Sequence, residues 1–240
     1  SLVGDDVRAA MWWALVPAGI SVALTLFVRE QRRPIAVAEQ ESVDRGEAAA
    51  RSKDPLPPAF RRVTTVLVLI AVVNFSDALL LLRVIELGHT TTEVVLAYVA
   101  FNTVYTLGAY PAGVLADRWP RPVVFAVGLS AFAIGYIGLG LVGQSGWVFV
   151  LVAVYGLFPA FTDGVGKAWV SSLVPTERTG HAQGVFQSLN NGAVLVAGLW
   201  AGLLWNVGPG DGQVPLLVAG GVAGTAAVAM AVAPGLRQKT

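Results

Sequence analysis

Two apolar runs joined by a short charged segment make up VLAYVAFNTVYTLGAYPAGVLADRWPRPVVFAVGLSAFAIGYIGLGLV, residues 95–142. The runs at 95–112 and 123–142 are each long enough to cross a bilayer as a helix, which takes about 20 mostly apolar residues. Strands of a membrane barrel would be about half as long and would alternate in polarity. The stretch therefore predicts two transmembrane helices connected by a compact turn at 113–122.

The same pattern extends over the whole chain. Hydrophobic residues make up 55% and charged residues only 13% of its 240 residues, whereas a soluble domain carries about 25% charge. There are no cysteines, so disulfides and thiol nucleophiles are excluded. We predict an all-α membrane protein, a polytopic helical bundle with seven transmembrane helices. The apolar runs that give this count are 9–28, 63–86, 94–112, 123–142, 147–172, 183–205 and 214–233.

Charge predicts the orientation of the spans. Residues 30–62 are polar, contain most of the charge and end in a proline-rich stretch, which is typical of a linker. If this linker is cytoplasmic, alternation of the spans leaves only Arg8 on the opposite side, a strong positive-inside pattern. The Lys and Arg residues then on the cytoplasmic side are Arg29, Arg32, Arg33, Arg45, Arg51, Lys53, Arg61, Arg62, Arg118, Arg121, Arg178, Arg237 and Lys239.

Small residues recur at four-residue spacing in the predicted helices. In lipid, such pairs allow helices to approach closely, although a sequence with 27 glycines also produces some pairs by chance. Taken together, they favour a tightly packed bundle. The pairs are Gly108 with Ala112, Ala131 with Gly135, Gly184 with Ser188 and Gly192, Gly198 with Gly202, and Gly220 with Gly224.

The charged segment GVLADRWPRP, residues 113–122, has a purely structural interpretation. Gly113 allows close helix packing, and Asp117 would favour the amino terminus of the next helix. Arg118 and Arg121 fit the positive-inside rule, and Pro122 suits a first helical turn. On this interpretation the segment fixes the topology and has no other role.

The segment also resembles the cytoplasmic signature of the major facilitator superfamily, roughly G-x-L-a-D-r-x-G-r-r. Gly113, Leu115, Asp117, Arg118 and Arg121 match it in register. The sequence departs from the signature at 120 and 122, where proline replaces a glycine and a basic residue. Two further stretches, VPTERTGHAQG (174–184) and NFSDALLLLRVIELG (74–88), are similar to other segments of this family.

This resemblance implies a domain organisation. Residues 1–29 would hold the last transmembrane helix of an amino-terminal half, 30–62 the cytoplasmic central linker, and 63–240 a carboxyl-terminal six-helix transporter domain. The sequence would then be a partial chain, which needs the missing amino-terminal helices or a partner chain.

The resemblance also implies a function and a location. The family's activity is secondary active transport of a small solute by alternating access, as an antiporter or symporter. Its members lie in the cell membrane, here with linker and carboxyl terminus cytoplasmic. The implied partners are a small-molecule substrate, protons and the lipid bilayer, with no nucleic acid. Gly113, Asp117, Arg118 and Arg121 would form a cytoplasmic gate that closes when the solute site faces outward.

Ionisable residues within spans are costly and mark candidate functional sites. Asp77, with Asn74 three residues before it on the same face of a helix, is the main candidate for proton coupling. Asp163 and Lys167 are four residues apart, so they would share a helix face. They are either a self-neutralising structural pair or groups that face a central cavity and contact substrate or protons.

Other polar residues within the spans have mainly structural interpretations. Arg83 and Glu86 lie near a membrane boundary and are expected to form a snorkelling pair. Pro159, in the same span as Asp163, is expected to bend its helix. Polar residues that either join helices or contact substrate are Asn102, Gln187, Asn190 and Asn191.

Three alternatives remain open. An intramembrane enzyme would need a catalytic set, but the two histidines, His89 and His181, lie in loops on opposite sides. No cofactor or metal site is indicated, and we expect no enzymatic activity. A seven-helix receptor fits the span count, but a retinal protein needs a lysine on its last helix. A regulatory half-transporter without transport activity of its own is the third alternative.

Overall fold

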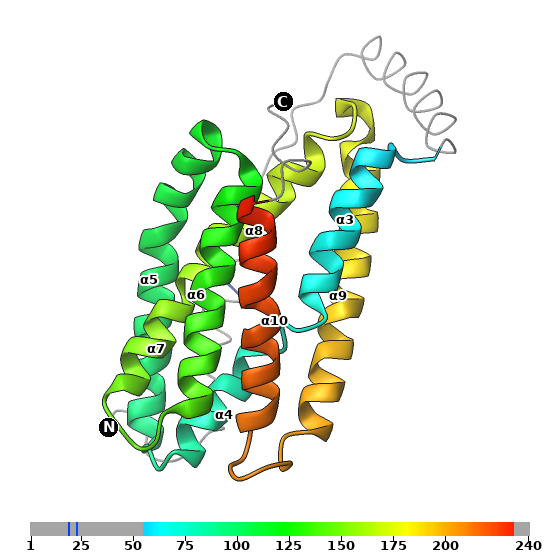
Figure 1. The fold of residues 1–240 in the computed structure, drawn as a ribbon. Coiled ribbons are helices and arrows are strands. Elements are labelled where there is room, and N and C mark those ends of the chain that lie inside the picture. Colours follow the sequence, from blue (N-terminus) through cyan, green and yellow to red (C-terminus); the bar gives the residue numbers. More distant parts are fainter. Residues whose placement is uncertain (1–18, 20–22, 24–54, 233–240) are drawn as a thin grey trace. The chain divides into compact units, whose positions relative to one another are not determined.

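The computed structural model describes residues 19, 23 and 55–232, and residues 55–232 form a bundle of helices without a strand (Figure 1). Apart from residues 19 and 23, the predicted first span at 9–28 lies outside the described residues. So does most of the predicted linker. The helices are α3 (Pro58–Ala71), α4 (Asp77–Glu86), α5 (Thr91–Arg118), α6 (Arg121–Leu141), α7 (Trp147–Tyr155), α8 (Leu157–Ser171), the 3₁₀ turn η1 (Thr176–Arg178), α9 (Thr179–Leu203) and α10 (Gln213–Val232).

Within the described part, four helical segments are long and apolar enough to cross a membrane. These are Thr91–Arg118, Arg121–Leu141, Trp147–Ser171 and Gln213–Val232. The predicted span at 183–205 is α9, which has 25 residues but also several amide side chains that lower its hydropathy. The predicted span at 63–86 is divided between α3 and α4, each too short to span alone.

The prediction of one continuous helix over 63–86 is therefore wrong. Helix α3 ends at Ala71, residues 72–76 have no helical structure, and α4 begins at Asp77. Ser76 supplies part of the physical reason, because its side chain accepts a hydrogen bond from the Ala78 backbone N–H at 3.3 Å and so caps α4.

A second interruption lies between α7 and α8, at Gly156. The expected bend at Pro159 is thus a change of helix three residues earlier, with Pro159 inside the first turn of α8. A Cβ atom at residue 156 would lie 2.6 Å from the carbonyl oxygen of Phe101 on α5. The glycine therefore lets α5 pack directly against the joint between α7 and α8.

The charged segment at 113–122 is mostly helical. Helix α5 continues to Arg118 and α6 begins at Arg121, so the turn consists only of Trp119 and Pro120. Asp117 lies in the last turn of α5, and the expectation that it precedes the amino terminus of the next helix as a dipole-stabilising acid is wrong. Pro122 does occupy the first turn of α6, as predicted.

The core is densest between α6 and its neighbours. Phe132 and Tyr136 of α6 are almost fully buried. Cβ atoms at Gly135 and Gly220 would lie only 2.9 and 2.7 Å from atoms of α7 and α6, so these small residues do allow close packing. The glycines of α9 differ, because a Cβ atom added to any of them would meet no described atom within 4 Å.

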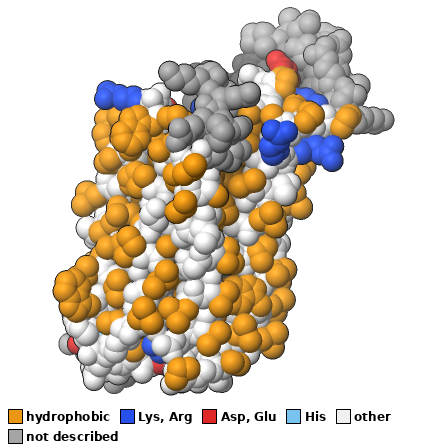
Figure 2. All heavy atoms as spheres, in the orientation of Figure 1, with side chains coloured by type: hydrophobic (Ala, Val, Ile, Leu, Met, Phe, Trp, Pro, Cys, Tyr) orange, Lys and Arg blue, Asp and Glu red, His pale blue; other side chains and the backbone are white. Residues whose placement is uncertain are grey.

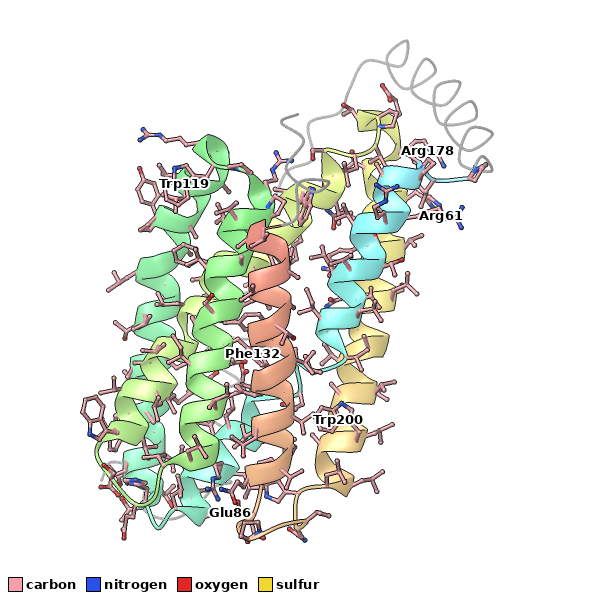
Figure 3. All side chains as sticks on the ribbon, viewed as in Figure 1. Arg61, Glu86, Trp119, Phe132, Arg178 and Trp200 are labelled. Carbon is pink, nitrogen blue, oxygen red and sulfur yellow. The ribbon has the colours of Figure 1, made fainter. Side chains whose placement is uncertain are left out.

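The helices stand side by side, with α3 next to α9 and α10 next to α6 (Figure 1). On the face shown in Figure 2, hydrophobic side chains cover most of the middle, and the Lys and Arg side chains in view lie towards the ends. Arg61, Trp119 and Arg178 lie at one end and Glu86 at the opposite end (Figure 3). This arrangement fits the predicted alternation of helix directions.

Candidate functional site

A polar cavity of about 260 Å³ lies between α3, α6, α8 and α9, and it is the best candidate for a functional site. Its walls combine apolar side chains with an acid, a base and several amides. The lining residues are Leu67, Ile70, Ala71, Asn74, Phe125, Phe158, Thr162, Asp163, Gly166, Lys167, Phe186, Gln187, Asn190 and Asn191.

The polar groups of the cavity come from three chain segments. Asp163 and Lys167 belong to α8, at the spacing that places both on one helix face. Asn74 comes from the non-helical stretch after α3. Three amide side chains come from two successive turns of α9, at Gln187, Asn190 and Asn191. One open cavity of an otherwise apolar bundle is therefore lined by several hydrogen-bonding groups.

Asp163 and Lys167 do not form a salt bridge with each other. Asp163 accepts only a long hydrogen bond, 3.5 Å from the hydroxyl of Tyr105. The Lys167 ammonium group has no hydrogen-bond partner within the described residues, although its backbone carbonyl accepts a bond from Gln183 Nε2 at 2.7 Å. No direct ion pair therefore joins the two charged groups, and both line the cavity.

Asp77 is not among the residues that line this cavity. Its Oδ1 atom accepts a hydrogen bond from the hydroxyl of Tyr155 at 2.7 Å. Tyr155 is buried and stacks against Phe101 of α5, with ring centroids 5.5 Å apart. Since the helix is broken between Asn74 and Asp77, the prediction that these two residues share a helix face is wrong. Asn74 lines the cavity, and Asp77 is joined to the aromatic core.

The non-helical residues 72–76 are held by side chains of distant helices. Trp200 of α9 donates a hydrogen bond from Nε1 to the Val72 carbonyl at 2.8 Å. The Tyr136 hydroxyl of α6 lies 3.5 Å from the Phe75 carbonyl oxygen, a weak contact. Backbone carbonyls freed by a helix break inside a membrane need such partners, because lipid offers none.

The expected snorkelling pair of Arg83 and Glu86 is also different in the structure. Arg83 is only 7% exposed and donates to the Leu139 and Asp211 carbonyls, at 3.2 and 2.6 Å. Glu86 instead accepts a hydrogen bond from Trp205 Nε1 at 2.9 Å. These bonds fix α4 to the end of α6 and to the segment between α9 and α10.

Three of the predicted gate residues lie in α5, towards the end opposite its capping box of Thr90 and Glu93, and Arg121 begins α6. Arg121 donates a hydrogen bond to Ser172 Oγ, which joins the start of α6 to the end of α8. Asp117 and Arg118 are exposed, and Gly113 has no neighbour within 4 Å of a Cβ built on it. Within the described residues, three of the four predicted gate residues therefore have open surroundings.

Sequence reasoning missed several residues that position this site. Tyr155 bonds Asp77, and Trp200 bonds the non-helical segment 72–76. Gln183 joins α9 to α8 through Lys167 and Ser171. Their partners are distant in sequence or on another helix, so no local pattern marks them. Within the described residues, no group of three or more His, Asp or Glu side chains could hold a metal ion.

Comparison with known proteins decides the family. Residues 64–239 match the model of the Major Facilitator Superfamily. The chain belongs to this superfamily. It is 27% identical over 160 residues to an uncharacterized MFS-type transporter of Methanocaldococcus jannaschii, covering 64% of this chain and 40% of that protein. No solved structure matches the chain.

Two further proteins similar to this chain have names that state a function. Over 125 residues it is 33% identical to the puromycin resistance protein of Streptomyces alboniger, covering 50% of this chain and 24% of that protein. Over 99 residues it is 31% identical to dipeptide and tripeptide permease A of Erwinia pyrifoliae, covering 38% and 20%. The chain thus spans less than half the length of these relatives.

Proposed function

We propose that this superfamily chain forms the carboxyl-terminal half of a secondary active transporter for a small organic solute. In this proposal, 1–29 is the last helix of the amino-terminal half, 30–62 the central linker and 63–240 the six-helix domain. The protein lies in the cell membrane, with linker and carboxyl terminus cytoplasmic. The names of the matched relatives, which include a permease and a resistance protein, support an organic substrate.

The observation that carries the proposal is the polar cavity within an apolar bundle. Asp163 and Lys167 are both exposed in the described bundle, although they lie in the span Trp147–Ser171. Charged groups in a membrane span are stable only where they face water, another polar surface or a solute. A second set of helices facing this cavity would enclose the solute and allow alternating access.

Proton coupling is assigned to the carboxylates. Asp77 is bonded to a tyrosine hydroxyl, and Asp163 lies beside the proposed solute site. Either group can take up a proton when its side of the membrane opens and release it when the other side opens. The resulting cycle would drive solute against its gradient, as a symporter or an antiporter.

Gly113, Asp117, Arg118 and Arg121 form the proposed cytoplasmic gate. Arg121 is already bonded to the end of α8, the helix that carries Asp163. Asp117 and Arg118 are exposed at the same end of the bundle and are free to pair with helices of the facing half. Closing the gate would then depend on ion pairs made across the two halves.

The proposal is tested without knowing the solute. Cells expressing the complete transporter, with this chain as its carboxyl-terminal half, are incubated in a medium rich in amino acids and peptides, and their small-molecule contents are compared by mass spectrometry. We expect at least one solute to differ from cells expressing the Asp163→Asn variant, and the difference to vanish when a protonophore collapses the pH gradient. Glu177→Gln, an exposed acid outside the cavity, is the matched control. Identical contents in all three cell lines would contradict transport.

A further inference from the structure

The charges of the cavity indicate a class of solute. Asp163 and Lys167 lie one helical turn apart and line the same cavity, yet no salt bridge joins them. An acid and a base at this spacing usually pair, and pairing would cancel the charge of the site. Here each of the two groups is left able to bind an opposite charge.

The remaining wall of the cavity limits the body of the solute. Phe125, Phe158 and Phe186 give it an apolar, aromatic side. The amides of Asn74, Gln187 and Asn190 offer both donors and acceptors. A volume of about 260 Å³ lies just below the usual range of ligand pockets, about 300–1,000 Å³, and fits a solute of amino-acid size.

We propose that this cavity binds a small zwitterionic solute with an apolar side chain, its ammonium group on Asp163 and its carboxylate on Lys167. This inference rests on the proposed function and specifies the substrate class of the same site. A cationic solute would leave the Lys167 ammonium beside the bound positive charge. An anionic solute would likewise leave the Asp163 carboxylate unpaired. A zwitterion satisfies both groups at once, so the site selects for it against solutes with one charge.

The test uses binding, which does not depend on transport. The purified full chain in lipid nanodiscs is titrated with L-phenylalanine and with L-alanyl-L-phenylalanine. Each probe is used in four forms: free, N-acetylated, carboxyl-methylated, and capped at both ends. We expect each single cap to weaken binding by about 10- to 100-fold, the value of one hydrogen bond to a charged group.

The variants assign the two charges. In Asp163→Asn, N-acetylation should no longer weaken binding, while methylation still does. In Lys167→Gln, the opposite pattern is expected. Within one variant, the ratio of the affinities for the capped and the free probe is insensitive to a general loss of stability. A purely structural role of either residue would therefore not change this ratio. Glu177→Gln and Arg62→Gln, both exposed and outside the cavity, are the controls for charge removal.

Several outcomes would overturn the inference. It is contradicted if the capped probes bind as tightly as the free ones. It is also contradicted if no probe binds to a protein that still unfolds cooperatively, or if the capped-to-free affinity ratios are unchanged in both variants. Binding of the zwitterion without any solute difference in cells would contradict transport and leave this inference standing. A solute difference in cells without zwitterion binding would support transport and contradict this inference.

Discussion

The chain passes between α3 and α4 through residues 72–76 without helical structure, whereas α7 passes into α8 at one glycine. At the first break, side chains of other helices bond the freed backbone, as Trp200 does with Val72. At the second, the Gly156 N–H still bonds to the Val152 and Ala153 carbonyls within its own span. The first break is maintained by tertiary hydrogen bonds and the second by close packing.

The difference has a consequence for the site. The break at 72–76 carries Asn74 into the cavity and starts α4 at Asp77, so both polar residues depend on it. The joint at Gly156 has no polar side chain of its own. It sets the position of α8, which carries Asp163 and Lys167, against α5. Substitutions at the two breaks should therefore have different kinds of effect.

The largest effect is expected at the packed joint. Gly156→Ala would place a Cβ atom 2.6 Å from the Phe101 carbonyl oxygen, so α5 must move away from the joint. Overpacking of this kind costs about 1–3 kcal/mol. Thermal unfolding of the purified protein in detergent should show a clearly lower midpoint. Gly164→Ala in the same span meets no atom within 4 Å and should unfold at or slightly above the wild-type midpoint, because alanine favours a helix over glycine. Equal midpoints for the two variants would contradict the packing account.

A smaller effect is expected at the bonded break. Trp200→Phe removes the N–H that reaches the Val72 carbonyl. A carbonyl left without a partner costs about 1–3 kcal/mol, and less where water can reach it. Hydrogen exchange should rise at the amides of 72–76 and remain unchanged in α6. Trp147→Phe, a tryptophan 67% exposed in the described bundle, is the matched control. Unchanged exchange at 72–76 in Trp200→Phe would show that the bond does not hold the break.

Tyr155→Phe should have the smallest effect on stability of the three. It keeps the aromatic stacking and removes the hydroxyl that bonds Asp77 at 2.7 Å and also contacts the Tyr136 hydroxyl. Asp77 is exposed within the described bundle, so we expect a loss of about 1 kcal/mol or less in the free energy of unfolding. If Asp77 couples protons, the pH dependence of solute accumulation should nevertheless shift in this variant. A wild-type pH profile would remove Asp77 from the coupling mechanism and leave Asp163 as the candidate.

Most helices could be predicted from the sequence, because long apolar runs have few alternatives in lipid. The ends of α5 and α6 could be predicted less well. The charged residues at 113–118 resemble a turn, but they continue the helix beyond the apolar run. The break at 72–76 was not predicted because Val72, Val73 and Phe75 continue the apolar run. Asn74 and Ser76, residue types that favour turns and N-caps, are the local signals.

The candidate site could be predicted only in part. Asp163, Lys167 and Asn74 stand out as polar residues in apolar runs, and the structure brings them to one cavity. The placing of Asp77 depends on Tyr155, 78 positions away in the chain, and no periodicity reveals that contact. The same is true of Trp200 and Val72, which are 128 positions apart. Contacts of this kind arise from helix packing and require the structure.

Thiol labelling tests the central claim, that the polar cavity is the water-filled path of a solute, most directly. The chain has no cysteine, so single cysteines can be introduced without further changes. Maleimides react with the thiolate, which forms in water and not in lipid. Asn191→Cys in the cavity and Ile134→Cys on α6, 56% exposed in mid-helix, are labelled in intact cells with a membrane-impermeant maleimide. We predict labelling of Asn191→Cys, reduced by the transported solute, and none of Ile134→Cys. Labelling of Ile134→Cys alone, or of neither, would contradict the account.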